Sequence, residues 1–177
     1  MALLLAVWQP ACAADSTEDK IAQALSGWGT YALVGGAVAM PLIAGHADWE
    51  TESLRTADAI VCAYALTLLL KELTGQPRPN GEGDDSFPSG HATLAFSAAT
   101  MAADYSPDEA PWWYGAAALV GWSRVRLNEH RPHEVLAGAA LGTGIAELEL
   151  DRPRGILVAP FIDPDTGATG VQARWEF

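Results

Sequence analysis

The hydrophobic positions along the chain form long segments that are separated by short runs rich in Gly, Pro, Asp and Ser. Most of these segments are longer than a typical strand, and they contain much Ala and few β-branched runs, which favours helices. The predicted order is an apolar stretch at 29–45, a polar loop at 46–55, and helices at 56–73, 89–103, 111–125 and 132–150. This pattern predicts an all-α bundle of five to six helices.

The pattern changes near the C-terminus, where 155–162 and 171–177 have the composition of strands. The intervening residues, Asp163-Pro164-Asp165-Thr166-Gly167, are typical of a turn. We therefore predict a short C-terminal β-hairpin within 155–177.

The N-terminal residues form a segment of their own. The apolar run 1–8 is followed by Ala11-Cys12-Ala13, which has the small-x-small pattern that a signal peptidase recognises. No Lys or Arg precedes the run, which is unusual for a signal peptide, and lipid attachment at Cys12 is an alternative that the preceding residues do not favour. We predict a signal peptide at 1–13, export to the periplasm, and a single domain at 14–177.

The chain is acidic, with a formal net charge of −12 at pH 7. This charge argues against nucleic acid as a partner, because nucleic-acid binding requires a basic surface. The positive charges are nevertheless concentrated, since five of the ten Lys and Arg residues and three of the four His residues fall between positions 71 and 133. We therefore expect an anion site in the middle of the chain.

Three short blocks in this basic region lie at predicted helix ends. They are Lys71 with Arg78-Pro79, then Pro88-Ser89-Gly90-His91, and finally Ser123-Arg124 with His130 and Glu134. Each block alone has an ordinary explanation, as a solvated lysine, a helix cap or surface histidines. Together they combine three cations and two imidazoles with a helix N-terminus, which binds anions through its free N–H groups.

Phosphoryl transfer explains this combination of residue types. A phosphoryl group in transfer spreads negative charge over its oxygens, so a catalyst without a metal needs cations and amide donors around it. Lys71, Arg78 and Arg124 would supply the charge, and the planar arginine groups can make paired hydrogen bonds to phosphate oxygens. An imidazole can act both as a nucleophile and as a proton donor.

The three blocks resemble the signature of the type 2 phosphatidic acid phosphatase (PAP2) and vanadium haloperoxidase superfamily. That signature reads Lys, six residues, Arg-Pro; Pro-Ser-Gly-His; and Ser-Arg, five residues, His, three residues, Asp, and the spacings of this chain agree with it throughout. The resemblance covers about residues 56–146, the catalytic core. It implies a PAP2-type helical bundle and a phosphatase that needs neither metal nor cofactor and forms a phosphohistidine intermediate.

By the same resemblance, His130 is the nucleophile, His91 is the general acid and Glu134 orients His130. The residues that would hold the phosphate are Lys71, Arg78, Ser89, Gly90 and Arg124. Glu134 departs from the signature, which has Asp at this position, and its longer side chain requires a shift of backbone or ring. The alternative for Glu134 is a residue that merely complements the positive end of the helix dipole.

Several other polar residues of the chain have no counterpart in the signature. The basic ones are His46, Arg126, Arg131 and His133. We interpret them as solvated surface or loop residues; contact with the rest of a substrate is the alternative for the two arginines, and a place in the pocket is the alternative for His133. The acidic residues at 82–85 lack the spacing of a calcium loop, so no metal site is predicted.

The signature does not choose among phosphate esters and diphosphates. A phosphorylated lipid is the substrate that the resemblance favours, and the alternatives are a small phosphate ester cleaved by a soluble exported acid phosphatase of broad specificity, a vanadium-dependent haloperoxidase, or a non-catalytic phospholipid-binding protein. The stretch 29–45 is near the lower length limit of a membrane span, and tryptophans flank the apolar segments. We expect membrane association, with the active site on the periplasmic side of the inner membrane.

Overall fold

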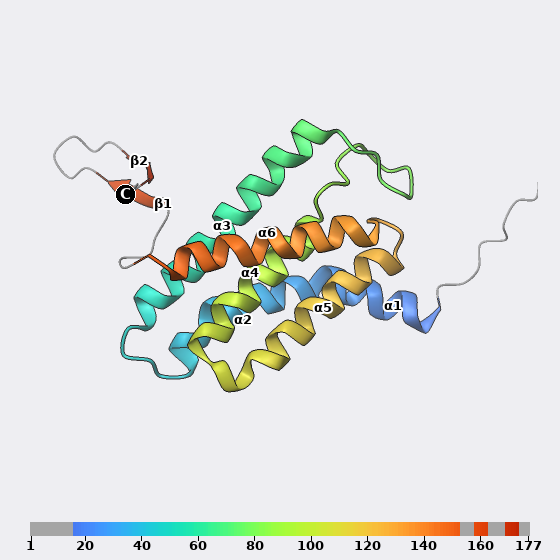
Figure 1. Ribbon diagram of the computed structural model, residues 1–177. Coiled ribbons are helices and arrows are strands. Elements are labelled where there is room, and N and C mark those ends of the chain that lie inside the picture. The colour runs from blue at the N-terminus through green and yellow to red at the C-terminus, as the bar shows by residue number, and fades with distance from the viewer. Residues whose placement is uncertain (1–15, 153–157, 163–168, 174–177) are drawn as a thin grey trace, which may run out of the picture.

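The computed structural model describes residues 16–152, 158–162 and 169–173. Helices make up most of the first range (Figure 1). In chain order the elements are α1 (Thr17–Ala24), the π-helix η1 (Leu25–Gly29), α2 (Thr30–Ile43), α3 (Trp49–Thr74), α4 (Gly90–Tyr105), the 3-10 helix η2 (Pro107–Glu109), α5 (Ala110–Arg126), α6 (Pro132–Leu150), β1 (Val158–Ile162) and β2 (Thr169–Ala173). The prediction of a helical bundle is confirmed.

Two helical segments differ from the sequence prediction. The segment α3 begins at Trp49 and not near residue 56, because the polar residues of the predicted loop form its first turns. Glu50 and Glu52 lie in the first turn, where negative charge is favourable, and Arg55 donates to the main-chain oxygen of Glu149 at the end of α6. The helix α1 was missed altogether, although Ser16 and Asp19 form a capping box at its start.

Helix α4 lies at the centre of the bundle and contacts α2, α3, α5 and α6 (Figure 1). Small side chains make this possible, because fully buried alanines line most of its length. One core cluster joins Ala95 and Ala99 of α4 to Leu33, Ala117 and Val120 of α2 and α5. The first residues of α4 are therefore fixed from several sides, which matters for the site described below.

Helices α4 and α6 approach each other closely at two glycines. A Cβ atom on Gly138 would lie 2.4 Å from the main-chain oxygen of Ser89, and one on Gly142 would lie 2.3 Å from that of Thr93. No side chain fits at either position. The pair of glycines therefore holds the N-terminus of α4 against the first half of α6.

The end of the chain contains two paired strands. β1 pairs with β2 in antiparallel register, with Val158 opposite Ala173 and Ile162 opposite Thr169. The predicted hairpin also includes 155–157, 163–168 and 174–177, which lie outside the described residues, so the hairpin over 155–177 stays a prediction. The predicted signal peptide at 1–13 lies outside them as well.

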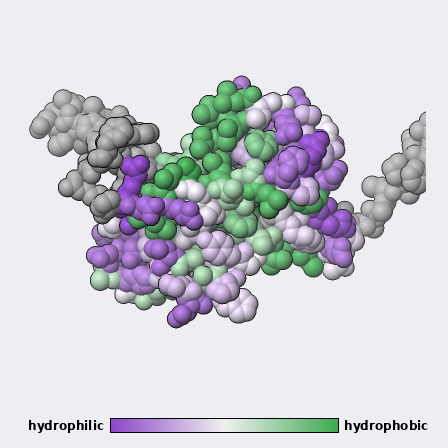
Figure 2. All heavy atoms as spheres, viewed as in Figure 1, coloured by the Kyte–Doolittle hydropathy of each residue, from purple (hydrophilic) through white to green (hydrophobic). Residues whose placement is uncertain are grey.

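Much of the surface of the helices is apolar. Within the part of the chain that the structure describes, α3 is the one helix that is long and apolar enough to cross a membrane by length and composition, and 33% of its most apolar window is buried. Figure 2 shows apolar surface along α3, and Leu68, Leu69 and Leu73 near its end are 48%, 54% and 72% exposed.

Candidate active site

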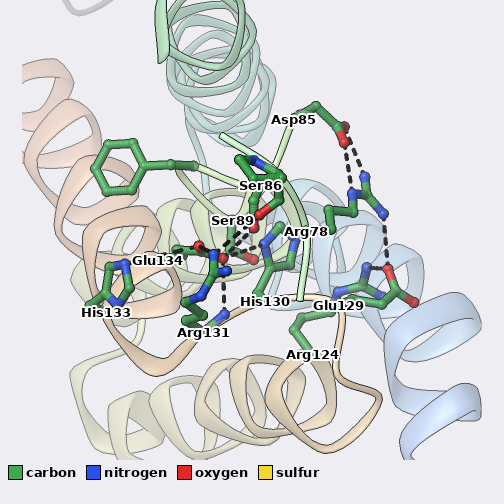
Figure 3. A network of polar contacts seen from close by, with 12 residues as sticks. Arg78, Asp85, Ser86, Ser89, Arg124, Glu129, His130, Arg131, His133 and Glu134 are labelled. Atoms are coloured by element: carbon green, nitrogen blue, oxygen red, sulfur yellow. Dashed lines mark hydrogen bonds and ion pairs between the residues drawn. The ribbon is translucent and has the colours of Figure 1, made fainter. Parts of the chain in front are cut away.

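The three sequence blocks meet at one end of the bundle. Lys71 lies in the last turn of α3, His91 lies in the first turn of α4, and Arg124 and His130 flank the junction of α5 and α6. Lys71, His91 and His130 line one cavity, and Figure 3 shows Arg124 and His130 beside Ser89 at the start of α4. The site is therefore built at helix ends, where main-chain N–H and C=O groups without helical partners are available.

The loop between α3 and α4 positions the first arginine. Gly75, with a φ of 52°, ends α3, and the main-chain N–H of Arg78 donates to the oxygen of Gly83 at 3.0 Å. The guanidinium of Arg78 makes a paired interaction with Asp85, with distances of 2.7 Å from Nε to Oδ1 and 2.8 Å from Nη2 to Oδ2. Lys71 Nζ donates to the main-chain oxygen of Asp85. Burial lowers the pKa of Lys71, whereas the carboxylate of Asp85 opposes this shift.

The second arginine is buried and held from two directions. Arg124 is only 4% exposed, and it donates to Ser26 Oγ through Nη1 and to Glu129 Oε2 through Nη2. The same oxygen of Glu129 accepts from Nη1 of Arg78 at 3.3 Å (Figure 3). One carboxylate thus bridges the two arginines.

The N-terminus of α4 supplies polar groups without protein partners. Ser89 is fully buried, and its Oγ has no hydrogen-bond partner among the described residues. On the neighbouring helix α5, the buried Nε of Arg124 also has no partner among these residues. The main-chain N–H of Ser89 donates to the oxygen of Glu134 at 3.0 Å, which ties the start of α4 to α6. At Gly90 a Cβ atom would meet Tyr64 at 3.3 Å, so the backbone lies close to α3.

His130 and Glu134 form a buried pair. The exposed fractions of the two residues are 3% and 0%, and Nδ1 of His130 lies 3.3 Å from Oε2 of Glu134. The carboxylate also accepts from Ser86 Oγ at 2.5 Å and from the main-chain N–H of Arg131 at 2.9 Å, both at Oε2, and from Nη1 of Arg131 at 2.8 Å at Oε1. Glu134 therefore contacts the imidazole ring of His130, which is the contact that an orienting role requires.

The environment lowers the pKa values of His91, His130 and Glu134. Burial lowers the pKa of His91 to about 4, and the positive charge of Arg124 contributes in the same direction. The pKa of His130 is also lowered, first by burial and then by Arg124 and Lys71, while the hydrogen bond to Glu134 opposes the shift. Burial disfavours the charged form of Glu134, but its hydrogen bonds outweigh burial and lower its pKa to about 2. At neutral pH His91 and His130 are therefore neutral imidazoles, and Glu134 is a carboxylate.

A cavity of about 140 Å³ opens on this group of residues. Its polar wall includes Lys71, Arg78, His91 and His130. Aromatic and aliphatic side chains also line it, namely Tyr31, Tyr64, Leu68 and Leu94. The cavity can therefore take a molecule with an anionic head and an apolar body.

The comparisons with known proteins agree with this geometry. The sequence model of the PAP2 superfamily matches residues 54–150, which is more than half of the chain. The chain belongs to the PAP2 superfamily. The resemblance drawn from the three blocks is thus confirmed, and Glu134 is a departure within the matched region.

Two known proteins are similar to this chain. A lipid A 1-phosphatase of Porphyromonas gingivalis is 38% identical over 78 residues, which are 42% of this chain but only 18% of that protein. The crystal structure of Aquifex aeolicus LpxE superposes with a TM-score of 0.66 at 22% identity, covering 79% of this chain and 89% of that one. The second likeness shows that the bundle has a PAP2-like fold.

Several residues of this PAP2 site were missed or misread from the sequence. Arg131, interpreted as a solvated surface residue, binds Glu134 and is part of the site. Ser86 and Glu129 were not singled out, and Ser26 lies outside the matched region. A single polar residue in a loop or a short helix carries no signal of its own, so only the folded arrangement reveals these partners.

Two of the other basic residues pair with carboxylates that are not part of the site. Arg126 pairs with Asp19 at 2.9 Å and so attaches α1 to α5, and His46 pairs with Glu52 at 2.6 Å in the turn before α3. The side chain of His133 is 60% exposed, as expected for a solvated residue, although its Nε2 lies 3.9 Å from Oε1 of Glu134. Among the described residues no group of three or more His, Cys, Asp or Glu side chains is arranged to hold a metal ion.

Proposed function

We propose that this protein is a phosphatase that cleaves a phosphomonoester or diphosphate of a lipid through a phosphohistidine on His130, without a metal or cofactor. The observation that carries the proposal is the buried contact between His130 and Glu134 beside the cations of the cavity. A carboxylate at Nδ1 keeps the proton on that nitrogen and leaves the lone pair on Nε2.

In the first step, Nε2 of His130 attacks the phosphorus atom and forms an N–P bond while the bond to the ester oxygen breaks. His91 donates a proton to the departing oxygen. In the second step, His91 takes a proton from water, the resulting hydroxide oxygen attacks phosphorus, and the N–P bond breaks to release inorganic phosphate. Glu134 stabilises the positive charge that develops on His130 during attack.

The cations and the helix N-terminus would bind the phosphoryl oxygens. Lys71, Arg78 and Arg124 offer positive charge, while Ser89 Oγ and the main-chain N–H groups at the start of α4, including that of Gly90, offer hydrogen bonds. The buried donors without protein partners support this assignment, because such groups are costly unless a ligand satisfies them.

The low pKa of His91 fits a proton donor that is charged only when substrate is bound. In the free protein the imidazole is neutral, because burial and the neighbouring cations disfavour a further positive charge. A bound phosphate dianion reverses the local charge and raises the pKa of His91. Binding of the substrate would thus favour the protonated form of His91, which acts as the general acid.

A phosphorylated lipid is the substrate class that the cavity and the relatives favour. Tyr31, Tyr64 and Leu68 line the same cavity as the cations Lys71 and Arg78. The relative from Porphyromonas gingivalis is named a lipid A 1-phosphatase. The substrate would approach from a membrane, and we place the protein at the periplasmic face of the inner membrane, in keeping with the predicted signal peptide.

The test is a panel of phosphorylated lipids, lipid diphosphates and soluble monoesters, assayed for phosphate release with a chelator present throughout. The wild-type chain should release phosphate from at least one lipid, and His130→Ala should not. His46→Ala removes a histidine from the turn before α3 and should retain wild-type turnover. Turnover by His130→Ala, or activity that depends on an added divalent metal, would overturn the proposal.

A further inference from the structure

Glu129 has contacts that the proposed reaction does not use. Its Oε2 atom accepts hydrogen bonds from both Arg78 and Arg124, the two arginines expected to hold the phosphate. Asp85 binds only the first of these arginines, through the opposite edge of its guanidinium. Among the described residues, Glu129 is therefore the carboxylate that lies between both arginines (Figure 3).

A carboxylate in this position presents the same chemistry as a phosphate oxygen. Both are anionic acceptors that take charge-assisted hydrogen bonds from guanidinium groups. A phosphate that binds Nη1 of Arg78 and Nη2 of Arg124 must therefore take over donors that Glu129 holds in the free protein. Two anions on the same donors also repel each other, so they compete.

The side chain can leave without disturbing the backbone. The main-chain N–H groups of Glu129 and His130 both donate to the main-chain oxygen of Arg124, at 3.1 and 3.2 Å. These bonds fix the turn, and the Glu129 side chain is 26% exposed and has solvent on one side. A change of rotamer is then enough to move the carboxylate away while His130 stays in place.

We propose that Glu129 is an internal competitor for the phosphate site. Its carboxylate neutralises Arg78 and Arg124 when the site is empty, yields them to the phosphoryl group of the substrate, and returns to displace the inorganic phosphate that the reaction leaves behind. The residue therefore sets the affinity for phosphate and assists its release. This inference rests on the proposed phosphate site, and it deepens that proposal by naming what limits product binding.

The test is calorimetric titration of the full chain with inorganic phosphate, comparing wild type, Glu129→Gln and Glu82→Gln. Glu129→Gln keeps the shape of the side chain and removes the competing charge, so phosphate should bind about tenfold more tightly, and phosphate should inhibit turnover at correspondingly lower concentration. Glu82→Gln removes the same charge from an exposed residue of the neighbouring loop that does not contact Arg124, and its effect should be much smaller.

Unchanged or weaker phosphate binding by Glu129→Gln would overturn the inference and would mean that Glu129 only holds the arginines in place. An equal gain in Glu82→Gln would also overturn it, because net charge alone would then explain the effect. Glu129→Ala is the second variant and should show the same gain. Binding needs no turnover, so a wild-type chain that binds phosphate but cleaves no ester would refute the proposed function and leave this inference standing.

Discussion

Glu134 replaces the aspartate of the PAP2 signature, and its neighbours show how the longer side chain fits. Ser86 and Arg131 hold the carboxylate, so that Oε2 lies 3.3 Å from Nδ1 of His130. We predict that Glu134→Gln lowers kcat by about 100-fold or more, because the amide cannot stabilise the charged ring or enforce its tautomer. The KM should change little, since Glu134 contacts Nδ1 of His130 and is not among the residues that line the cavity. Steady-state kinetics on the preferred substrate checks both values.

Glu134→Asp is the matched control for this prediction. It keeps the charge and restores the residue of the family signature, but it withdraws the carboxylate from Ser86 and Arg131. Its kcat should fall less than that of Glu134→Gln. If the glutamine variant turns over at the wild-type rate, Glu134 only complements the helix dipole, and its role in orienting His130 is wrong.

His91 links the site to the stability of the protein. Its pKa is about 4 in the folded state, against 6.5 for an unperturbed histidine, so the unfolded chain binds a proton more readily between these values. The contribution of neutral His91 to the free energy of unfolding is complete above pH 6.5. It is lost as the pH falls towards 4, which lowers the free energy of unfolding by up to about 3 kcal/mol. We predict that His91→Asn reduces the drop in unfolding free energy between pH 7 and pH 4. Denaturant titration at the two pH values measures it, and an unchanged drop in the variant would contradict the assignment.

At the scale of elements, the packing of α4 on α6 places the N-terminus of α4, the proposed phosphate site, beside His130 and Glu134. Gly138→Ala would bring a methyl group within 2.4 Å of the main-chain oxygen of Ser89, so the helices must separate. We predict a loss of about 1–3 kcal/mol in unfolding free energy and a fall in turnover, because Ser89 moves with α4. Gly144→Ala on the same helix meets nothing within 4 Å and should leave stability equal or slightly higher. Equal thermal midpoints for the two variants would show that the close approach is not required.

The elements also show what sequence patterns can and cannot reveal. Glycine and proline mark helix ends directly, and the ends at Gly75 and Pro132 were predicted from them. The start of α3 was misplaced, because acidic residues at 50 and 52 read as a loop when their role at a helix N-terminus is not considered. The short helix α1 has a weakly apolar sequence, and its capping box was the available signal. The sequence pattern within an element therefore predicts its type, while its exact limits depend on neighbouring elements. For α3 the neighbour is the end of α6, which Arg55 contacts.

At the scale of the whole molecule, residues far apart in the sequence form one site. The order and spacing of the three blocks were enough to predict which histidines and cations come together, because the family signature relates sequence to geometry. Ser26, Ser86 and Glu129 could not be predicted in this way, since their roles exist only once η1, the loop before α4 and the α5–α6 turn lie side by side.

The surface of the whole molecule leads to a prediction about its location. Large apolar side chains are unusually exposed, including Trp28 at 85%, Trp112 at 81% and Ile43 at 79%. We predict that the expressed protein sediments with membranes and needs detergent for release, because these residues would be buried in the lipid. Fractionation with a carbonate wash measures this. Complete recovery in the supernatant without detergent would instead support a soluble exported phosphatase.

The central claim is that His130 carries the phosphoryl group. The most direct measurement is to quench the protein during turnover of a phosphate-labelled substrate, in the presence of chelator, and to map the label by mass spectrometry under alkaline conditions that preserve phosphohistidine. The account predicts a phosphoryl group on His130, attached at Nε2 because Nδ1 faces Glu134, and no label in His130→Ala. A label on another residue, or release of phosphate by His130→Ala at the wild-type rate, would contradict it.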